Sequence, residues 1–208
     1  MRILIPGRQP RSVTPRDLQR AKIPKRWWDV AVSGVPKDSP QQRAVKQYIE
    51  NVVDYLRRGV GIVFTGEHGR GKTSAAVVCA KAAIAHGGRV LYVSGGDLKS
   101  VMIEKPEFDE YETVPQRIRS VDLLILDDPD RGGDTTWNRQ VSETVLRERS
   151  GNGRSTIVCS AIPATDIQRF FGHGAVSLMK ESMVWVTCVG PDLRDDAGAH
   201  LTKEFDAR

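Results

Sequence analysis

The sequence predicts an α/β domain in which helices cover both faces of a parallel sheet. Five short apolar segments alternate with stretches of helical character along the 208 residues. These segments are apolar almost throughout, which is typical of strands that are buried on both faces. A glycine-rich motif also separates the first apolar segment from a helical stretch, as in nucleotide-binding α/β domains. A chain of this length provides one such domain with a substantial core and short extensions.

The first helix is expected over residues 40–58. Pro40 suits the first turn of a helix, and Gly59 is a common helix terminator. Between them, apolar residues recur at intervals of three or four and form one face: Ala44, Val45, Tyr48, Ile49, Val52, Val53 and Leu56. The β-branched segment 60–65 then predicts the first strand.

Helices and strands alternate from there to the end of the chain. Further strands are expected at residues 89–93, 121–126, 155–159 and 183–189. A helix is expected from residue 74 to about 85, and a polar helical region at 97–119 that Pro106 interrupts. A further helix is expected after Gly132-Gly133, with the apolar residues Trp137, Val141, Val145 and Leu146. A short polar tail begins at about Asp195.

Positive charge is concentrated at the N-terminus. Residues 1–26 hold eight Arg and Lys against one acidic residue, Asp17, so they carry +7 of a total net charge of +5 and leave −2 for the remainder. A basic arm that contains proline suits contact with nucleic acid phosphates or with an acidic protein surface. The alternative is a solvated, partly disordered tail.

The cysteines and the hydropathy indicate a protein of the reducing interior of the cell. Cys79, Cys159 and Cys188 are widely spaced and lie in helical or apolar segments, which predicts buried thiols rather than a disulfide or a metal site. No apolar segment approaches the roughly 20 residues that span a membrane. Pro6-Gly7-Arg8 interrupts a few N-terminal apolar residues too early for a signal peptide. We therefore expect a cytoplasmic protein.

Residues 66–73 read Gly-Glu-His-Gly-Arg-Gly-Lys-Thr and match the phosphate-binding loop pattern G-x-x-x-x-G-K-[ST] at every fixed position. The strand before the motif and the helix after it disfavour an ordinary glycine-rich turn. In this arrangement, backbone N–H groups and the helix N-terminus surround a β-phosphate. Lys72 is expected to contact the β- and γ-phosphates, and the Thr73 hydroxyl to ligate Mg²⁺. The other expected nucleotide-binding residues of this segment are Gly66, Gly69, Gly71 and Ser74.

Two aspartates end the third predicted strand. In P-loop enzymes, an aspartate at such a strand end holds the Mg²⁺ site, and a further carboxylate orients the attacking water. Asp127 suits the metal role and Asp128 the role of general base, with Lys72 as the other catalytic residue. The alternative is a strand-terminal turn with capping aspartates. A small-molecule kinase fits less well, because the chain has no arginine-rich lid insertion and its acidic strand end matches the ATPase pattern.

Four further residues are open to two interpretations. His68 and Arg70 lie inside the loop, at positions that usually carry outward-facing side chains, and no role is assigned to them. Trp27 and Trp28 follow Pro24-Lys25-Arg26 and either stack on a base or pack on the core.

The chain resembles the AAA+ ATPases of the DnaC helicase-loader family, which includes the IstB-like transposition helpers. The resemblance covers about residues 23–194. It rests on Ile23-Pro24-Lys25-Arg26-Trp27, Gly66–Thr73, Leu123–Asp128, Ser155–Ser160 followed by Pro163, and Gly190-Pro191-Asp192-Leu193-Arg194. The phosphate loop is specific only to a superfamily, whereas its combination with the double aspartate and the terminal Gly-Pro-Asp-Leu-Arg is more specific.

The resemblance implies a three-layer αβα domain of the AAA+ type over residues 27–194, with a five-stranded parallel sheet in the order 5-1-4-3-2 and no large lid. Residues 1–26 then form a basic arm and residues 195–208 a polar tail. The implied ligands are ATP and Mg²⁺, and Ser160 and Arg194 join the residues that contact the nucleotide.

The implied function is to load a replicative hexameric helicase onto single-stranded DNA, with self-association in ATP or on DNA. Region 97–119 corresponds to a helical element near the DNA path. Its candidate phosphate contacts are Lys99, Arg117 and Arg119.

Two positions depart from the family pattern. A polar residue, often Asn, usually follows the fourth strand and senses the γ-phosphate, whereas this chain has Ala161 there and leaves Ser160 to substitute. A Ser-Arg-Leu motif usually sends an arginine into the neighbouring subunit's site, whereas this chain has Leu178 at the arginine position, with Lys180 or Arg169 as the remaining candidates. Loss of such an arginine costs about 10³–10⁵ in rate. We therefore expect firm ATP binding and slow or partner-dependent hydrolysis.

Three functions stay open. The leading hypothesis is the helicase loader, from a phage or mobile element given the compact length, with the N-terminal arm contacting the helicase. The second is a transposition helper that assembles on duplex DNA. The third is a nucleotide-switched adaptor that binds ATP and a partner but hydrolyses little, which the apolar Leu178 and Ala161 favour.

Overall fold

A single parallel sheet forms the centre of the molecule. The computed structural model describes residues 9–103, 113–131 and 135–194. Its strands are β1 (Gly61–Thr65), β2 (Val90–Ser94), β3 (Leu123–Asp127), β4 (Ser155–Ser160) and β5 (Met183–Thr187). They pair in the order β2-β3-β4-β1-β5, and all pairs are parallel. The predicted order 5-1-4-3-2 is this order read from the other edge, and it is confirmed.

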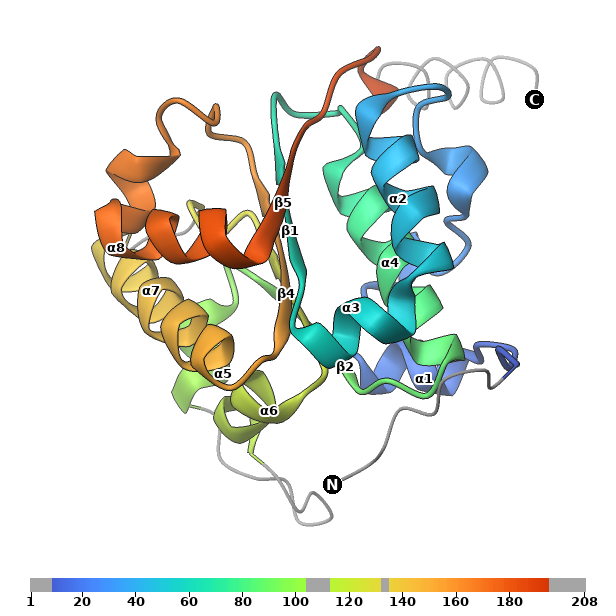
Figure 1. Cartoon of the computed structure of the whole chain (residues 1–208), viewed down its shortest axis with the longest axis horizontal. Helices are drawn as coiled ribbons and strands as arrows, with labels where there is room; N and C mark the ends of the chain where they lie inside the picture. The colour runs from blue at the N-terminus through green and yellow to red at the C-terminus, as the bar shows by residue number, and fades with distance from the viewer. Residues whose placement is uncertain (1–8, 104–112, 132–134, 195–208) are drawn as a thin grey trace, which may run out of the picture.

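Helices cover both faces of the sheet (Figure 1). One layer contains α2 (Pro40–Glu50), α3 (Val52–Arg58) and α4 (Lys72–Ala85). The other contains α7 (Thr135–Gly151) and α8 (Ile167–Ser182), with α5 (Leu98–Ile103) and α6 (Val114–Ser120) beside them. Successive strand residues point to opposite layers: Ile62 and Phe64 join one apolar cluster, and Val63 joins the other. Burial on both faces explains why the strands are apolar almost throughout.

The predicted helix 40–58 is two helices. It is interrupted at Asn51, whose side-chain amide donates to the Gln47 carbonyl at 2.9 Å and so competes with the helix's own hydrogen bonds. The second helix ends as expected at Gly59, which has a φ of 69°.

Helix α8 was not expected from the sequence. Its buried residues recur at helical spacing: Ile167, Phe171, Ala175, Val176 and Met179. Gly172, with a φ of 78°, kinks the helix and obscures that pattern, because glycine is a weak helix former and reads as a break in the sequence.

The N-terminal segment is folded onto the domain from residue 9 onward. Helix α1 (Pro15–Arg20) begins with a capping box formed by Thr14 and Asp17. Leu18, Ala21 and Ile23 are buried in the core, and the Tyr92 N–H donates to the Ala21 carbonyl at 2.8 Å, beside β2. The alternative of a partly disordered tail therefore does not describe residues 9–26, because three apolar side chains anchor the segment. Residues 1–8, Pro106 and the tail at 195–208 lie outside the described residues.

The three cysteines are free and buried, as predicted. Burial raises the pKa of all three thiols, for Cys188 to about 12. Among the helices that the structure describes, none has the length and apolar character to cross a bilayer.

Candidate nucleotide-binding site

The phosphate loop connects β1 to α4 at the carboxyl ends of the strands. Gly66, Gly69 and Gly71 have φ values of 128°, 76° and 79°, which glycine adopts without strain. A Cβ at Gly69 would also lie 1.7 Å from Asp192 Oδ1, so a larger residue there would have to displace the Asp192 side chain. Helix α4 begins at Lys72, so its first turn presents backbone N–H groups toward the loop.

Lys72 is nearly fully buried beneath the loop that precedes it. Its ammonium donates to the carbonyls of Gly66 at 2.6 Å and Glu67 at 2.7 Å. The charged group is thus held at the centre of the loop by two main-chain oxygens. Ser74, in the first turn of α4, is also buried.

Thr73 and Asp127 meet across the site. The Thr73 hydroxyl donates to Asp127 Oδ1 at 2.9 Å, with Oδ2 at 3.2 Å. The Tyr92 hydroxyl of β2 also donates to Asp127 Oδ2. Burial raises the pKa of the Asp127 carboxyl, and the Tyr92 and Thr73 hydroxyl donors oppose that rise. The structure therefore brings the two predicted metal ligands together and adds a tyrosine that orients the carboxylate.

The backbone after β3 turns sharply at Asp128. Its φ is 47°, a value that costs a non-glycine residue on the order of 1–3 kcal/mol and is found most often at functional sites. The turn carries Arg131, whose guanidinium lies 3.5 Å from Asp128 Oδ2 and 3.2 Å from His68 Nε2 of the phosphate loop. Arg131 thus links the predicted general base to the loop.

Ser160, the predicted sensor substitute, is fully buried at the end of β4. Its hydroxyl donates to Asp130 Oδ1 at 3.1 Å and accepts from the Ile162 N–H at 3.1 Å. Burial raises the pKa of Asp130. Ser160 therefore fixes the loop after β3, and Ala161 after it carries no polar side chain toward the site.

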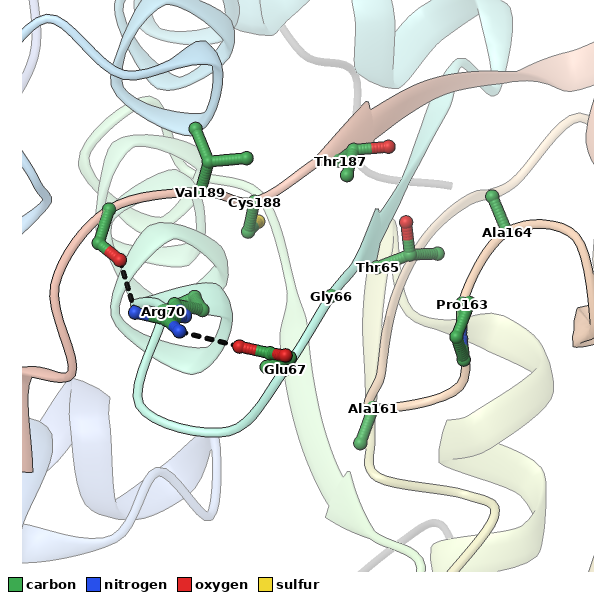
Figure 2. A pocket seen from close by; sticks show the side chains of 11 residues that line it. Thr65, Gly66, Glu67, Arg70, Ala161, Pro163, Ala164, Thr187, Cys188 and Val189 are labelled. Carbon is green, nitrogen blue, oxygen red and sulfur yellow. Dashed lines mark hydrogen bonds and ion pairs between the residues drawn. The ribbon is translucent and has the colours of Figure 1, made fainter.

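A cavity of about 470 Å³ lies beside the start of the phosphate loop. Figure 2 shows Gly66 and Glu67 on one side of it and Ala161, Pro163 and Ala164, from the loop after β4, on the other. The lining is mostly apolar. Ala161, at the predicted sensor position, lines this space with only a methyl group.

The segment after β5 folds back over the phosphate loop. Arg70 donates to the Gly190 carbonyl and to Glu67, as Figure 2 shows. The Leu193 N–H donates to the Gly69 carbonyl at 3.1 Å. Arg194 follows as an exposed residue, and its N–H donates to Asp192 Oδ1 at 2.9 Å.

Gln41 joins this segment to the loop and to α2. Its side-chain amide is fully buried and donates to the carbonyls of Arg70 at 3.0 Å and Val189 at 2.7 Å. Its Oε1 accepts from the Val189 N–H at 3.3 Å. One buried side chain thus connects three segments around the site.

The sequence profile of the IstB-like ATP-binding proteins matches residues 8–179. The chain belongs to this family. The replicative helicase loader DnaC of Buchnera aphidicola subsp. Schizaphis graminum is 24% identical to this IstB-like protein over 151 residues, which cover 70% of this chain and 59% of the relative. The chain therefore spans about three fifths of the length of the curated relatives it matches.

Solved structures agree with this assignment at the level of the fold. A crystal structure of the DnaC helicase loader has a TM-score of 0.67 at 24% identity and covers 80% of this chain and 100% of that one. The replication initiator DnaA bound to AMPPCP and single-stranded DNA has a TM-score of 0.61 at 20% identity, covering 86% of this chain and 56% of that one. By its family this is an ATP-binding protein, and its fold is that of the P-loop NTPases, with no large lid among the described residues.

Several predicted residues of the IstB-like protein lie away from the loop. Arg117 donates to the Arg20 carbonyl, and Arg119 forms an ion pair with Glu148 at 2.6 Å. Lys99 is on α5. The structure thus engages Arg117 and Arg119 in contacts within the chain, and their contact with DNA stays a prediction.

The two tryptophans pack against the core, in agreement with the second interpretation. Trp28 Nε1 donates to the Ile23 carbonyl at 2.8 Å, and the Arg26 guanidinium lies 5.0 Å from the centre of the Trp27 ring. On α8, Leu178 is half-buried, and Arg169 and Lys180 are exposed.

Sequence reasoning missed Tyr92, Gln41 and Arg131. Each contacts the predicted site from an element that is distant in the chain or from a variable loop, so no local pattern marks them. The nearest signal was that Tyr92 lies in the predicted strand that precedes the strand of Asp127. This signal identifies a contact only once β2 and β3 are known to pair with Tyr92 opposite Ile125.

Proposed function

We propose that the protein loads a replicative helicase onto single-stranded DNA and uses Mg-ATP bound at its phosphate loop to do so. Membership of the IstB-like family and the likeness to DnaC loaders support the class of activity. The observation that carries the proposal is the contact between Thr73 and Asp127, because it joins the phosphate loop to the acidic strand end as Mg-ATP chemistry requires.

The residues present fit a magnesium ion. No group of three or more His, Cys, Asp or Glu side chains is arranged to hold a metal within residues 9–103, 113–131 and 135–194. Mg²⁺ in ATPase sites needs no such group, since it takes one or two protein oxygens and completes its shell with water and phosphate oxygens. Thr73 and Asp127 supply those protein oxygens. When bound, the ion neutralises charge that develops on the phosphate oxygens.

The chain's own residues divide the remaining tasks. Lys72 exchanges its two main-chain acceptors for phosphate oxygens, and the N–H groups at the start of α4 hold the β-phosphate. Asp128 orients a water molecule and accepts its proton. Its carboxylate lies 3.5 Å from Arg131, whose guanidinium also contacts His68 of the loop.

The test compares Lys72→Ala and Asp128→Asn, because asparagine tolerates the backbone conformation at 128. We expect Lys72→Ala to abolish ATP binding. Asp128→Asn keeps ATP binding and slows phosphate release at least about 100-fold, within the range for a lost catalytic base. Loading is measured as helicase retained on single-stranded DNA with and without ATP, and both variants lose the ATP-dependent part.

Two alternatives have their own observations and outcomes. The match to the IstB-like family favours a transposition helper as the first alternative. Tighter binding to duplex than to single-stranded DNA in the presence of ATP supports the helper and contradicts the loader. The absence of polar side chains at Ala161 and Leu178 favours an adaptor. Phosphate release by Asp128→Asn at the wild-type rate, with binding abolished in Lys72→Ala, selects the adaptor.

The basic N-terminal segment remains the proposed contact for the helicase or for nucleic acid. Its charged side chains Arg16 and Arg20 are exposed on α1, while Leu18 between them is buried. Deleting residues 1–26 therefore removes core side chains together with the charges. Replacing Arg16 and Arg20 by glutamate isolates the charge from the packing.

A further inference from the structure

Arg131 places a cation between the phosphate loop and the predicted base. Its Nη2 lies 3.2 Å from His68 Nε2, and its Nη1 lies 3.5 Å from Asp128 Oδ2. His68 is the third residue of the loop, on the part that precedes the buried Lys72. A guanidinium has five N–H donors, so these two contacts leave donors for a further acceptor.

The backbone that carries Arg131 is firmly supported. The Arg131 N–H donates to the Asp128 carbonyl at 2.9 Å and closes a tight turn. The Asn138 side chain of α7, only 3% exposed, donates to the Arg131 carbonyl at 2.9 Å and to the Gly95 carbonyl at 3.2 Å. A buried amide thus fixes this turn against the end of β2.

Gly95 and Ser160 support the same turn from two further sides. A Cβ at Gly95 would lie 2.0 Å from the Asp128 carbonyl oxygen and 2.7 Å from the Arg131 carbonyl oxygen, so the turn packs directly on this glycine. Ser160 binds Asp130 from β4 at 3.1 Å. A loop with no role beyond connecting two elements does not need this number of buried polar tethers, which suggests that it positions a side chain.

ATP hydrolysis needs positive charge near the terminal phosphate. The oxygen of a water molecule bonds to the γ-phosphorus, the bond from that phosphorus to the β–γ bridging oxygen breaks, and the water proton passes to Asp128, leaving ADP and phosphate. The negative charge on the γ-phosphate oxygens must be stabilised throughout. Lys72 supplies one cation, but Leu178 stands where the family resemblance places an arginine that reaches a neighbouring subunit's site.

We propose that Arg131 is a catalytic residue that supplies this missing cation from the same chain, by donating to a γ-phosphate oxygen. The inference rests on the proposed ATPase function. The predicted base, Asp128, and the proposed cation, Arg131, then belong to the same hydrogen-bonded turn after β3. His68 then holds the guanidinium at the loop.

The experiment uses Arg131→Ala and Arg131→Gln in the full chain, with Arg139→Ala as matched control, since Arg139 is an exposed arginine of α7. The Arg131 side chain is 54% exposed, so neither variant disturbs the core. We expect both to lower single-turnover phosphate release about 10³-fold or more, with the Kd for ADP within about twofold of wild type. Arg139→Ala keeps the wild-type rate.

A second readout does not depend on turnover. ADP with aluminium fluoride imitates the transferring phosphoryl group, and we expect its affinity to fall about 100-fold in both Arg131 variants. If the wild-type protein binds ADP–aluminium fluoride no more tightly than ADP, or if the Arg131 variants match wild type in rate and affinity, the inference is wrong. If the affinity falls as expected while the wild-type protein loads no helicase, the proposed function fails and the inference stands.

Mixing two inactive variants separates action in the same chain from action on a neighbour. Arg131→Ala has an intact phosphate loop, and Lys72→Ala has an intact Arg131. If the arginine acts within its own chain, the mixture releases no more phosphate than Arg131→Ala alone. Recovery of more than about a tenth of the wild-type rate shows that Arg131 acts on a neighbouring subunit and overturns the proposal.

Discussion

Arg149 offers a quantitative test of how the domain is held together. Its side chain is fully buried on α7, and its guanidinium donates to Thr156 Oγ1 at 2.9 Å and to the carbonyls of Ile118 at 2.8 Å, Val121 at 3.0 Å and Ser155. These acceptors belong to α6 and to the beginnings of β3 and β4. One side chain thus ties three elements at the amino ends of the strands, whereas the phosphate loop lies at their carboxyl ends.

The charge is costly where it lies. Burial lowers the pKa of Arg149 to about 9 from 12.5, a difference of roughly 5 kcal/mol against the charged form. The four acceptors must offset that cost, and Arg149→Ala leaves all of them buried without this donor, at ~1 kcal/mol or more each. The substitution also opens a cavity and removes the cost of the buried charge, and these two effects largely offset each other. We therefore expect a net loss of about 3–5 kcal/mol in the free energy of unfolding, which lowers Tm by roughly 8–16 °C for a chain of this size.

Urea unfolding followed by circular dichroism measures this change. Arg147→Ala is the matched control, because Arg147 lies on the same helix in an exposed ion pair with Glu143 at 3.1 Å; we expect less than about 0.5 kcal/mol there. Arg149→Met keeps most of the side-chain volume without the charge and is expected to lose less than Arg149→Ala. A loss under about 1 kcal/mol in Arg149→Ala would falsify the assignment of Arg149 as the tie between these elements.

Two further predictions concern the metal ligand and the N-terminal segment. Tyr92→Phe removes the hydroxyl that orients Asp127. We expect the Mg²⁺ concentration for half-maximal ATP binding to rise about tenfold, with metal-free ADP binding unchanged. A Mg²⁺ titration identical to that of the wild type contradicts the positioning role. Hydrogen bonds from Arg11 hold the pKa of Asp17 well below its ordinary value. The stability contributed by Asp17 is therefore present above pH ~4 and is lost as pH falls below it. Asp17→Asn should flatten the decline in urea midpoint between pH 5 and 3, and a parallel decline in both proteins would refute this.

The strands and their order were accessible from the sequence because burial on both faces leaves a continuous apolar pattern. Residues 121–126 are apolar at nearly every position, whereas a surface helix is apolar on one face only, so this segment reads as a buried strand. The phosphate motif, in turn, marks where the first strand ends. The packing of the N-terminal segment on the core was not foreseen, because its charges dominate its composition. Only Leu18, Ala21 and Ile23 anchor it, and three apolar residues among eight basic ones do not form a recognisable period.

The candidate site was accessible only in part for a similar reason. Lys72, Thr73 and Asp127 follow from local motifs, whereas Tyr92, Gln41 and Arg131 act through contacts between elements. Tyr92 reads from the sequence as one more apolar strand residue, and its hydroxyl gains meaning only from the pairing of β2 with β3. Arg131 lies in a polar turn, where a basic residue is common and gives no functional signal until its neighbours in space are known.

The burial of Cys79, Cys159 and Cys188 has a practical consequence for following this protein at work. Thiol reagents attack the thiolate, so buried thiols with raised pKa values react slowly in the folded protein. A single cysteine introduced at an exposed position such as Ser177 on α8 therefore accepts a fluorophore without removal of the native three. The same three thiols become accessible on unfolding, so their alkylation rate also reports the fraction of protein that has opened.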